Sequence, residues 1–115
     1  MLRWIRALRL IQTQDERMQA QTVLVLSIIA EFGPMRMSQV RDDAGISQAS
    51  VSRNCAALGK IHRKGAPGLG LIKAEEDPMD RKHKIVSLTP KGEAFIDTLR
   101  DILEDRGERS DNEYH

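Results

Sequence analysis

The spacing of apolar residues predicts two helices in the first third of the chain. Between positions 2 and 14, apolar residues recur at intervals of three and four, and arginines occupy the other face. The segment 17–32 is apolar nearly all round in its second half, which is typical of a helix in the centre of a core. Gly33 and Pro34 end this helix, and residues 35–37 suffice only for a short strand.

Capping residues predict two further helices joined by a glycine turn. Ser38 is a suitable N-cap for a short helix over 39–44, and Gly45 ends that helix because glycine accepts the left-handed conformation of a helix C-terminus. Ser47 is a suitable N-cap for the next helix. Two short helices joined in this way indicate a helix-turn-helix.

The helix after Ser47 has one apolar face and one polar face. Val51, Cys55 and Leu58 recur at intervals of four and three, so we expect them to face the core. The residues left outside are small or polar and include one arginine; they are Gln48, Ala49, Ser52, Arg53 and Ala56.

The last third of the chain predicts a β-hairpin followed by a helix. Segments 69–74 and 84–88 are expected to be strands on either side of a charged turn over 75–82. Thr89 is a suitable N-cap for the last helix, and Pro90 fits its first position, where a missing N–H costs nothing. The apolar stripe of this helix comprises Phe95, Ile96, Leu99, Ile102 and Leu103.

This order of elements predicts a mainly α (α+β) fold, namely a winged helix-turn-helix in which the hairpin is the wing. With 115 residues the chain has room for one domain. We expect a winged helix-turn-helix core over 17–92, flanked by terminal dimerisation helices over 1–16 and 93–106. The polar residues 107–115 are expected to form a flexible tail.

Composition narrows the setting in which the protein works. Aromatic residues make up only 3% of the chain, so the core is expected to be aliphatic. The single cysteine, Cys55, cannot form an internal disulfide, which favours a reducing compartment. The longest apolar run is too short to cross a bilayer, and residues 1–10 lack the features of a secretory signal. We therefore expect a cytoplasmic protein with no membrane partner.

Charge is distributed unevenly along the chain, although the net charge is only +1. Residues 36–91 contain eleven lysines and arginines and six acidic residues, whereas residues 92–115 contain three and eight. A basic middle suits a polyanion such as nucleic acid, and an acidic tail would be repelled by one.

The segment 47–53 has the residue types that base recognition in a DNA major groove requires. Gln48 and Arg53 carry donors suited to base edges, and Ala49 is small enough to contact a thymine methyl group. The serines allow close approach and bonds to phosphates. The alternative interpretation is an ordinary solvated helix face. The candidate DNA-binding residues of the helix-turn-helix are Ser38, Ser47, Gln48, Ala49, Ser50, Ser52 and Arg53.

Further basic residues precede and follow the first strand predicted for the wing. Lys60, Arg63 and Lys64 either extend the contact with phosphates or simply keep a loop soluble. Lys82 and Lys84 are expected to contact phosphates as well.

Apolar stripes near the two chain ends predict a homodimer. A small helix-turn-helix domain cannot cover both stripes, so pairing of the terminal helices would bury them and would place two recognition helices one DNA turn apart. The alternative is a monomer that folds its ends together. The candidate dimerisation residues are Trp4, Ile5, Leu8, Ile11, Leu99, Ile102 and Leu103.

With these elements in this order, the chain resembles the MarR family of winged-helix transcription regulators over about residues 18–96. The segment 45–53 resembles the family's recognition segment, 70–72 resembles its entry to the wing, and 77–82 resembles its wing tip. Residues 86–92 resemble the family pattern V-x-L-T-x-x-G. The other matching residues are Gln21, Val23, Leu24, Ser38, Gln39 and Val40.

The resemblance implies a homodimer that binds double-stranded DNA at a roughly palindromic operator and controls transcription without a cofactor. It implies that Arg81 enters the minor groove and that Asp80 either holds this guanidinium or braces the recognition helix. The chain departs from the family in a basic, glycine-rich insertion over 59–69 and in its brief terminal helices. Many members bind small aromatic acids, but the sequence identifies neither a clear pocket nor an effector here.

The sequence contains no pattern typical of a catalytic or metal site. We find no nucleophile, acid–base pair or phosphate loop, so we do not expect an enzyme. Asp77, Asp80 and His83 are spaced by three, but a hairpin tip does not gather such residues on one face, so we expect no metal. Cys55 is expected to be a buried filler rather than a redox switch. The alternative function is a winged helix that binds a polymerase or another regulator.

Overall fold

The chain folds into helices around one small sheet, in a computed structural model that describes residues 1–60 and 67–104. The predicted tail over 107–115 lies outside these ranges. None of the described helices is long and apolar enough to cross a membrane. The elements are α1 (Leu2–Gln12), α2 (Ala20–Phe32), β1 (Met35–Arg36), α3 (Met37–Ala44), α4 (Gln48–Leu58), β2 (Ile72–Asp77), β3 (Asp80–Leu88) and α5 (Pro90–Leu103).

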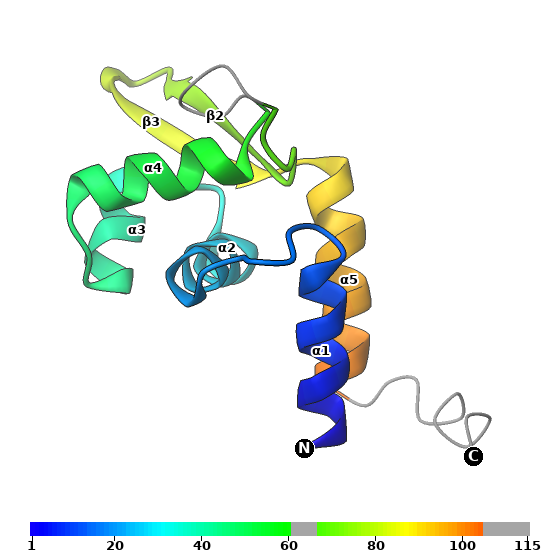
Figure 1. Cartoon of the computed structure of the whole chain (residues 1–115). Helices are drawn as coiled ribbons and strands as arrows, with labels where there is room; N and C mark the ends of the chain where they lie inside the picture. The colour runs from blue at the N-terminus through cyan, green and yellow to red at the C-terminus, as the bar shows by residue number, and fades with distance from the viewer. Residues whose placement is uncertain (61–66, 105–115) are drawn as a thin grey trace.

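The three strands form one antiparallel sheet in the order β1–β3–β2. Met35 of β1 lies opposite Val86 of β3, and Ile72 of β2 lies opposite Leu88 at the other edge of the same strand. Figure 1 shows the β2–β3 hairpin extending from the top of α5 across α4. This arrangement confirms the predicted α+β fold with a helix-turn-helix, formed by α3 and α4, and a wing, formed by β2 and β3.

β2 begins three residues later than the predicted segment 69–74 and is no longer than it, β3 begins four residues earlier than the predicted segment 84–88, and the charged turn expected over 75–82 is wrong in extent. β2 continues to Asp77 and β3 begins at Asp80, so the hairpin turns through Pro78 and Met79 alone. The four central residues of β2 are exposed. A two-stranded ribbon that faces solvent tolerates charged side chains and lacks the alternating apolar pattern of a half-buried strand.

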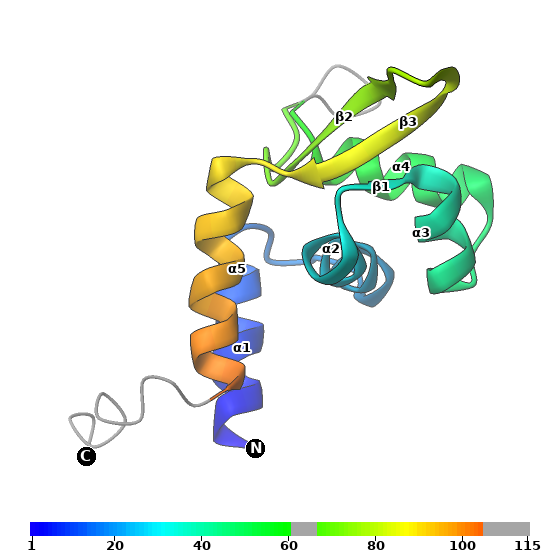
Figure 2. The same ribbon diagram turned by 180° about the vertical axis from the view of Figure 1, so that it is seen from behind.

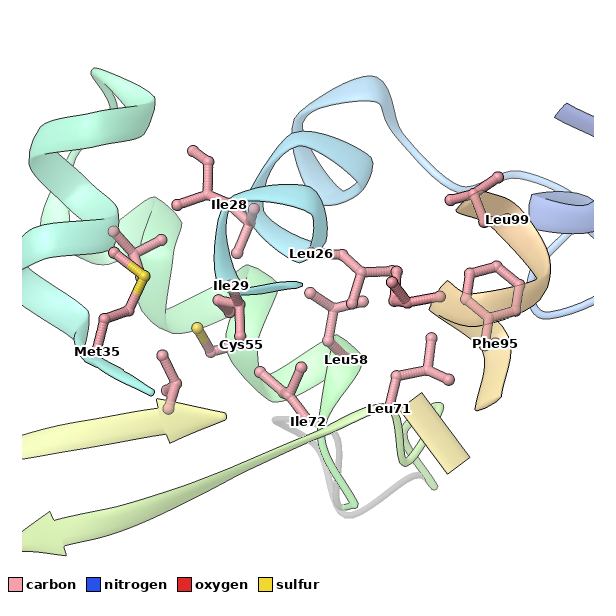
Figure 3. Close-up of a cluster of buried hydrophobic side chains, with 14 of the residues drawn as sticks. Leu26, Ile28, Ile29, Met35, Cys55, Leu58, Leu71, Ile72, Phe95 and Leu99 are labelled. Atoms are coloured by element: carbon pink, nitrogen blue, oxygen red, sulfur yellow. The ribbon is translucent and has the colours of Figure 1, made fainter. Parts of the chain in front are cut away.

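The core is built around α2, as the apolar sequence of this helix predicted. Figure 3 shows Ile29 of α2 above Cys55 of α4, and Leu58 of α4 on the side of the cluster toward Phe95 of α5. Val51, Cys55 and Leu58 are all buried, which confirms the inward face predicted for α4. The orientation of α4 is therefore fixed by aliphatic packing, and its opposite face is left to solvent.

The ends of α4 and α5 follow the predicted capping. The Ser47 hydroxyl accepts the backbone N–H of Ser50 at 3.1 Å, and the Thr89 hydroxyl accepts that of Gly92 at 3.0 Å. Gly45, between α3 and α4, has a φ of 68°, in the left-handed region where glycine is favoured. These confirmed caps set the points at which the second helix of the helix-turn-helix and the last helix begin.

The capping role predicted for Ser38 is wrong. α3 begins at Met37, directly after β1, so Ser38 already lies inside the helix. The N-cap is Arg36, whose backbone N–H donates to the side-chain oxygen of Gln39 at 2.9 Å. Pairing of Arg36 with Ile85 in the sheet brings the helix start forward.

Gly92 allows α5 to start directly against the chain that enters β2. A Cβ atom at position 92 would lie 1.9 Å from the carbonyl oxygen of Leu71. The same carbonyl accepts the backbone N–H of Thr89 at 3.0 Å. The glycine that closes the pattern V-x-L-T-x-x-G is thus required by a close approach of two backbones.

The helices α1 and α5 lie side by side, away from the hairpin tip (Figures 1 and 2). They run antiparallel, and Arg3 near the start of α1 donates to the carbonyl of Leu103 at the end of α5. Ile11 and Leu99, expected at a dimer interface, are only 7% and 8% exposed. Both side chains pack into the core of their own chain, so they are buried before any second copy is added.

An apolar strip nevertheless stays uncovered on the α1–α5 pair. Ile102 is half-buried, whereas the other four candidate dimerisation residues keep 40% or more of their surface exposed. The exposed candidates are Trp4, Ile5, Leu8 and Leu103.

Candidate nucleic-acid interface

The outward face of α4 is open to solvent, as its polar residues predicted. Gln48, Ala49, Ser52 and Arg53 are exposed, together with the N-cap Ser47. Figures 1 and 2 show that the N-terminal end of α4 and the tip of the hairpin lie at the same end of the molecule, opposite the α1–α5 pair. Two protruding elements are thus available to one large partner.

A chain of hydroxyl groups holds Arg53 against the first turn of α4. The Ser47 hydroxyl donates to the Ser50 hydroxyl at 3.0 Å, and Arg53 Nη2 donates to the same Ser50 oxygen at 3.0 Å. Ser50 is half-buried, whereas Ser47 and Arg53 are exposed. Its side chain therefore positions Arg53 in the free protein, a role that the sequence did not indicate.

Gln48 is similarly held from the preceding helix. Its side-chain oxygen lies 3.4 Å from Nη1 of Arg41 on α3, and Arg41 also pairs with Asp42 at 2.9 Å. Arg41 thus contributes positive charge beside the N-terminus of α4. It was not among the predicted residues, because it precedes Gly45 and belongs to a different helix.

Asn54 ties α4 to α2 through a buried polar network. The Thr22 hydroxyl donates to Asn54 Oδ1 at 2.7 Å, and Asn54 Nδ2 donates to Gln21 Oε1 at 2.9 Å and to the Ser50 carbonyl at 2.8 Å. Asn54 is only 7% exposed, and its amide oxygen and nitrogen are both hydrogen-bonded. Since buried amides require partners, this network fixes the orientation of α4 on α2.

An ion pair anchors the wing to the start of α3. Arg36 Nη2 and Nε lie 2.8 and 3.0 Å from Oδ2 of Asp77, at the end of β2. The other carboxylate oxygen accepts the backbone N–H of Met79 at 2.9 Å. The Met79 N–H, and then Arg36, hold the pKa of Asp77 below its usual value, although burial alone would raise it.

Asp80 makes other contacts in the free protein than those expected of it. Its carboxylate accepts the backbone N–H of Lys82 at 3.2 Å and lies 3.5 Å from His83 Nε2. The carboxylate that joins the wing to the helix-turn-helix is that of Asp77, and it does so at the start of α3.

The other basic candidates differ in what the structure shows of them. Arg81, Lys82 and Lys84 of the wing are exposed, as is Lys60 after α4. Arg63 and Lys64 lie outside the described residues. The acidic Glu76 of the wing lies opposite Lys84 in the register of the sheet, and Lys73 lies 3.4 Å from Glu75. Within the described hairpin, acidic side chains therefore have basic neighbours.

Cys55 is a packed core residue. It is buried, and desolvation raises the pKa of its thiol to about 11. A protonated, buried thiol is a poor nucleophile. Within residues 1–60 and 67–104, no cluster of histidine, cysteine and carboxylate side chains has the composition of a metal site.

Two hollows flank α4. One, of about 420 Å³, is lined by polar side chains that include Arg17, Gln21 and Asn54. The other, of about 510 Å³, lies toward β2 and is lined by Cys55, Ile72 and nine further residues. None of the described residues that line them is aromatic.

Comparison with known proteins agrees with this geometry. The family model described as a winged helix DNA-binding domain matches residues 18–92. The fold is similar to that of a MarR transcriptional regulator from Methanosarcina mazei Go1, with a TM-score of 0.68 and 18% identity over 94% of this chain and 70% of that one. No curated protein matches the chain.

Two further similar structures concern DNA binding. One is Bordetella bronchiseptica BpsR, whose DNA binding is regulated by 6-hydroxynicotinic acid (TM-score 0.60, 25% identity, 93% of this chain and 76% of that one). The other is reduced AbfR bound to DNA (TM-score 0.64, 15% identity, 84% and 66%). The chain belongs to the family of winged helix DNA-binding domains. Its fold is that of the MarR-like regulators, which confirms the resemblance seen in the sequence.

Proposed function

We propose that this chain is a sequence-specific transcription regulator that binds a pseudo-palindromic operator as a homodimer. The observation that carries the proposal is that the N-terminal end of α4, whose polar residues are exposed, and the hairpin tip lie at the same end of the fold (Figure 1). A helix of this kind fits the major groove, and a hairpin beside it that exposes Arg81 next to its turn fits the neighbouring minor groove. The proposal includes no catalytic step and places the protein in the cytoplasm.

In this proposal the residues divide into three groups by what they contact. Gln48, Arg53 and Ala49 contact base edges, because they carry a donor and an acceptor, several donors, and a small apolar surface, respectively. Arg81 lies in the minor groove, where the negative potential is strongest. The phosphate contacts are Ser38, Ser47, Ser52, Lys60, Arg63, Lys64, Lys82 and Lys84.

The second half of the proposal, the homodimer, rests on the α1–α5 pair. Trp4, Ile5, Leu8 and Leu103 leave an apolar strip on a pair of helices that project from the core. Covering this strip with a second copy removes it from water and relates two α4 helices by a two-fold axis. Ile11 and Leu99 are already buried in the core of this chain, so they do not belong to the exposed strip.

Selection of bound duplexes from a random pool tests the proposal directly. We expect an inverted repeat whose half-sites are about ten base pairs apart, since two-fold related helices enter successive major grooves. Sedimentation at micromolar concentration is expected to give the mass of two chains. A pool without enrichment would leave the alternative of a winged helix that binds a protein. A monomeric mass would overturn the dimer alone.

A small-molecule effector is a further part of this proposal, without an assigned identity. The hollow of about 420 Å³ beside Asn54 reaches the network that orients α4. A ligand seated there would compete for the polar groups that hold the helix. Thermal shift of the protein by small carboxylic acids, compared between wild type and Arg17→Ala, measures whether this hollow is used.

A further inference from the structure

The tip of the wing carries an apolar side chain that the fold itself does not use. Met79 is 90% exposed, more than any other large apolar residue of the described chain except Met1. Its two-residue loop with Pro78 closes the hairpin between Asp77 and Asp80. Removing this side chain is therefore expected to cost the fold almost nothing.

The backbone that presents Met79 is held in place. Its N–H donates to Asp77 at 2.9 Å, and Asp77 is buried and paired with Arg36 at 2.8 Å. Pro78 restricts the backbone before it, because its ring fixes φ. A contact made by a pre-ordered loop avoids the entropy that a mobile loop would lose on binding.

The charges around the tip indicate what Met79 meets. Arg81 and Lys82 follow it within three positions and are exposed, whereas Asp77 is buried in its ion pair with Arg36 and Asp80 is half-buried beside His83. The most exposed charges near Met79 are therefore cations, which would bring the tip against phosphates. The apolar side chain would then lie between the sugar walls of the minor groove, where wedges of methionine and other apolar residues partly unstack base steps.

Building on the proposed function, we propose that Met79 is a minor-groove wedge that makes the wing sensitive to DNA deformability. A thioether has no strong donor with which to read base edges, so it discriminates between sequences only through shape and flexibility. Its unbranched side chain adapts to an irregular groove. The preferred partner is a flexible pyrimidine–purine step outside the half-site that α4 reads.

The test compares Met79→Ala with Met79→Leu on the duplex most enriched from the random pool. Burial of part of one methionine side chain predicts that Met79→Ala loses affinity about three- to tenfold. Met79→Leu should keep nearly the whole affinity of the wild type. Bending, measured by energy transfer between the duplex ends, should fall with Met79→Ala. Phe32→Ala is the matched control, because Phe32 is an exposed apolar residue on α2.

The salt dependence of DNA binding distinguishes a contact made by Met79 from contacts made by the neighbouring cations. The slope of log Kd against log salt should be unchanged in Met79→Ala and lower by about one in Arg81→Ala. Equal affinity and equal DNA bending of wild type and Met79→Ala would overturn the proposed wedge. A loss of affinity in Met79→Ala that is accompanied by a lower salt slope would overturn it as well. If wild type itself enriches no duplex, the proposed function fails instead.

Discussion

Arg36 and Asp77 join the two halves of the proposed interface, with Nη2 of the guanidinium 2.8 Å from Oδ2 of the carboxylate. Arg36 lies immediately before α3, and Asp77 ends the first strand of the wing. The same carboxylate holds the backbone of Met79. One ion pair therefore fixes both the distance between the wing and the helix-turn-helix and the shape of the wing tip.

Loss of this carboxylate should give a pH-dependent defect. The folded-state pKa of Asp77 is lowered, so its contribution to stability is present above the unfolded value, about 4, and is lost as pH falls through the folded pKa. Asp77→Asn should lower Tm at pH 7, and the difference from wild type should shrink toward pH 3. Thermal unfolding from pH 3 to 7 measures it, with exposed Asp43→Asn as control. A difference independent of pH would contradict the ion-pair explanation.

Asn54→Ala should lower the free energy of unfolding, because it removes the hydrogen-bond partner of neighbouring polar groups. Thr22 would lose the partner of its buried hydroxyl, and an unsatisfied buried polar group costs about 1–3 kcal/mol, whereas the exposed Gln21 can bond to water instead. Urea unfolding should show this loss, and Ser52→Ala on the exposed face of α4 should not. Binding to the selected duplex should also weaken, since α4 loses its fixed orientation. Unaltered stability would show that the network is not coupled to the fold.

Arg53→Ala should reduce the preference for the selected duplex over a scrambled one by about 1–3 kcal/mol, because a bidentate contact to a base edge is lost. Competition titrations of the two duplexes give this quantity. Ser50→Ala is the companion variant: it keeps the guanidinium and removes the hydroxyl that accepts from Arg53 and Ser47, so most of the preference should remain. An unchanged preference in Arg53→Ala would exclude base contact by this residue.

Replacing Lys82 and Lys84 together by alanine should change the salt dependence and leave sequence preference intact. Phosphate contacts contribute affinity by releasing counterions, so two lost contacts lower the slope of log Kd against log salt by about two. Titrations between low and moderate salt measure this slope. Lys91→Ala, on α5, provides a control outside the wing. A wild-type slope in the double variant would remove both lysines from the contact set.

Leu8 and Leu99 should respond differently to substitution although both lie on the terminal helices. Leu8 is 40% exposed, so Leu8→Asp should dissociate the dimer. Leu99 is buried, so Leu99→Ala should lower the free energy of unfolding by about 2–5 kcal/mol through the cavity it leaves. Sedimentation and urea unfolding of both variants distinguish the effects. A Leu8→Asp protein that sediments like wild type would contradict dimerisation through α1.

Local signals in the sequence were sufficient for much of the fold. Ser47 and Thr89 cap helices through a neighbour three positions away, and such contacts depend only on the local sequence. The buried face of α4 followed from helical spacing alone. The prediction that Ser38 is an N-cap failed because Arg36 pairs in the sheet, a tertiary contact that places the start of α3 one residue before Ser38. The exposed wing gave no alternating pattern, so its strand ends were missed.

The contacts that position the site were less accessible to sequence reasoning. Arg36 and Asp77 are separated by 41 positions, and Thr22 and Asn54 by 32. Asn54 follows Arg53 and was assigned to neither face of α4 from the sequence. Its spacing of three from Val51, on the inward side, was the signal that would have marked it as buried. To predict the burial of Ile11 and Leu99, one would have had to know that the two terminal helices pack together.

The hydrogen bond between Arg53 and Ser50 engages one donor of the guanidinium proposed to read DNA. Where base contact breaks that bond, only the difference between the old bond and the new one contributes to affinity. A guanine edge offers two acceptors and so binds the guanidinium more strongly than one serine oxygen does, whereas a base edge with a single weak acceptor does not. The serine contact in the free protein therefore lowers the gain in affinity from a wrong base more than it lowers the gain from guanine.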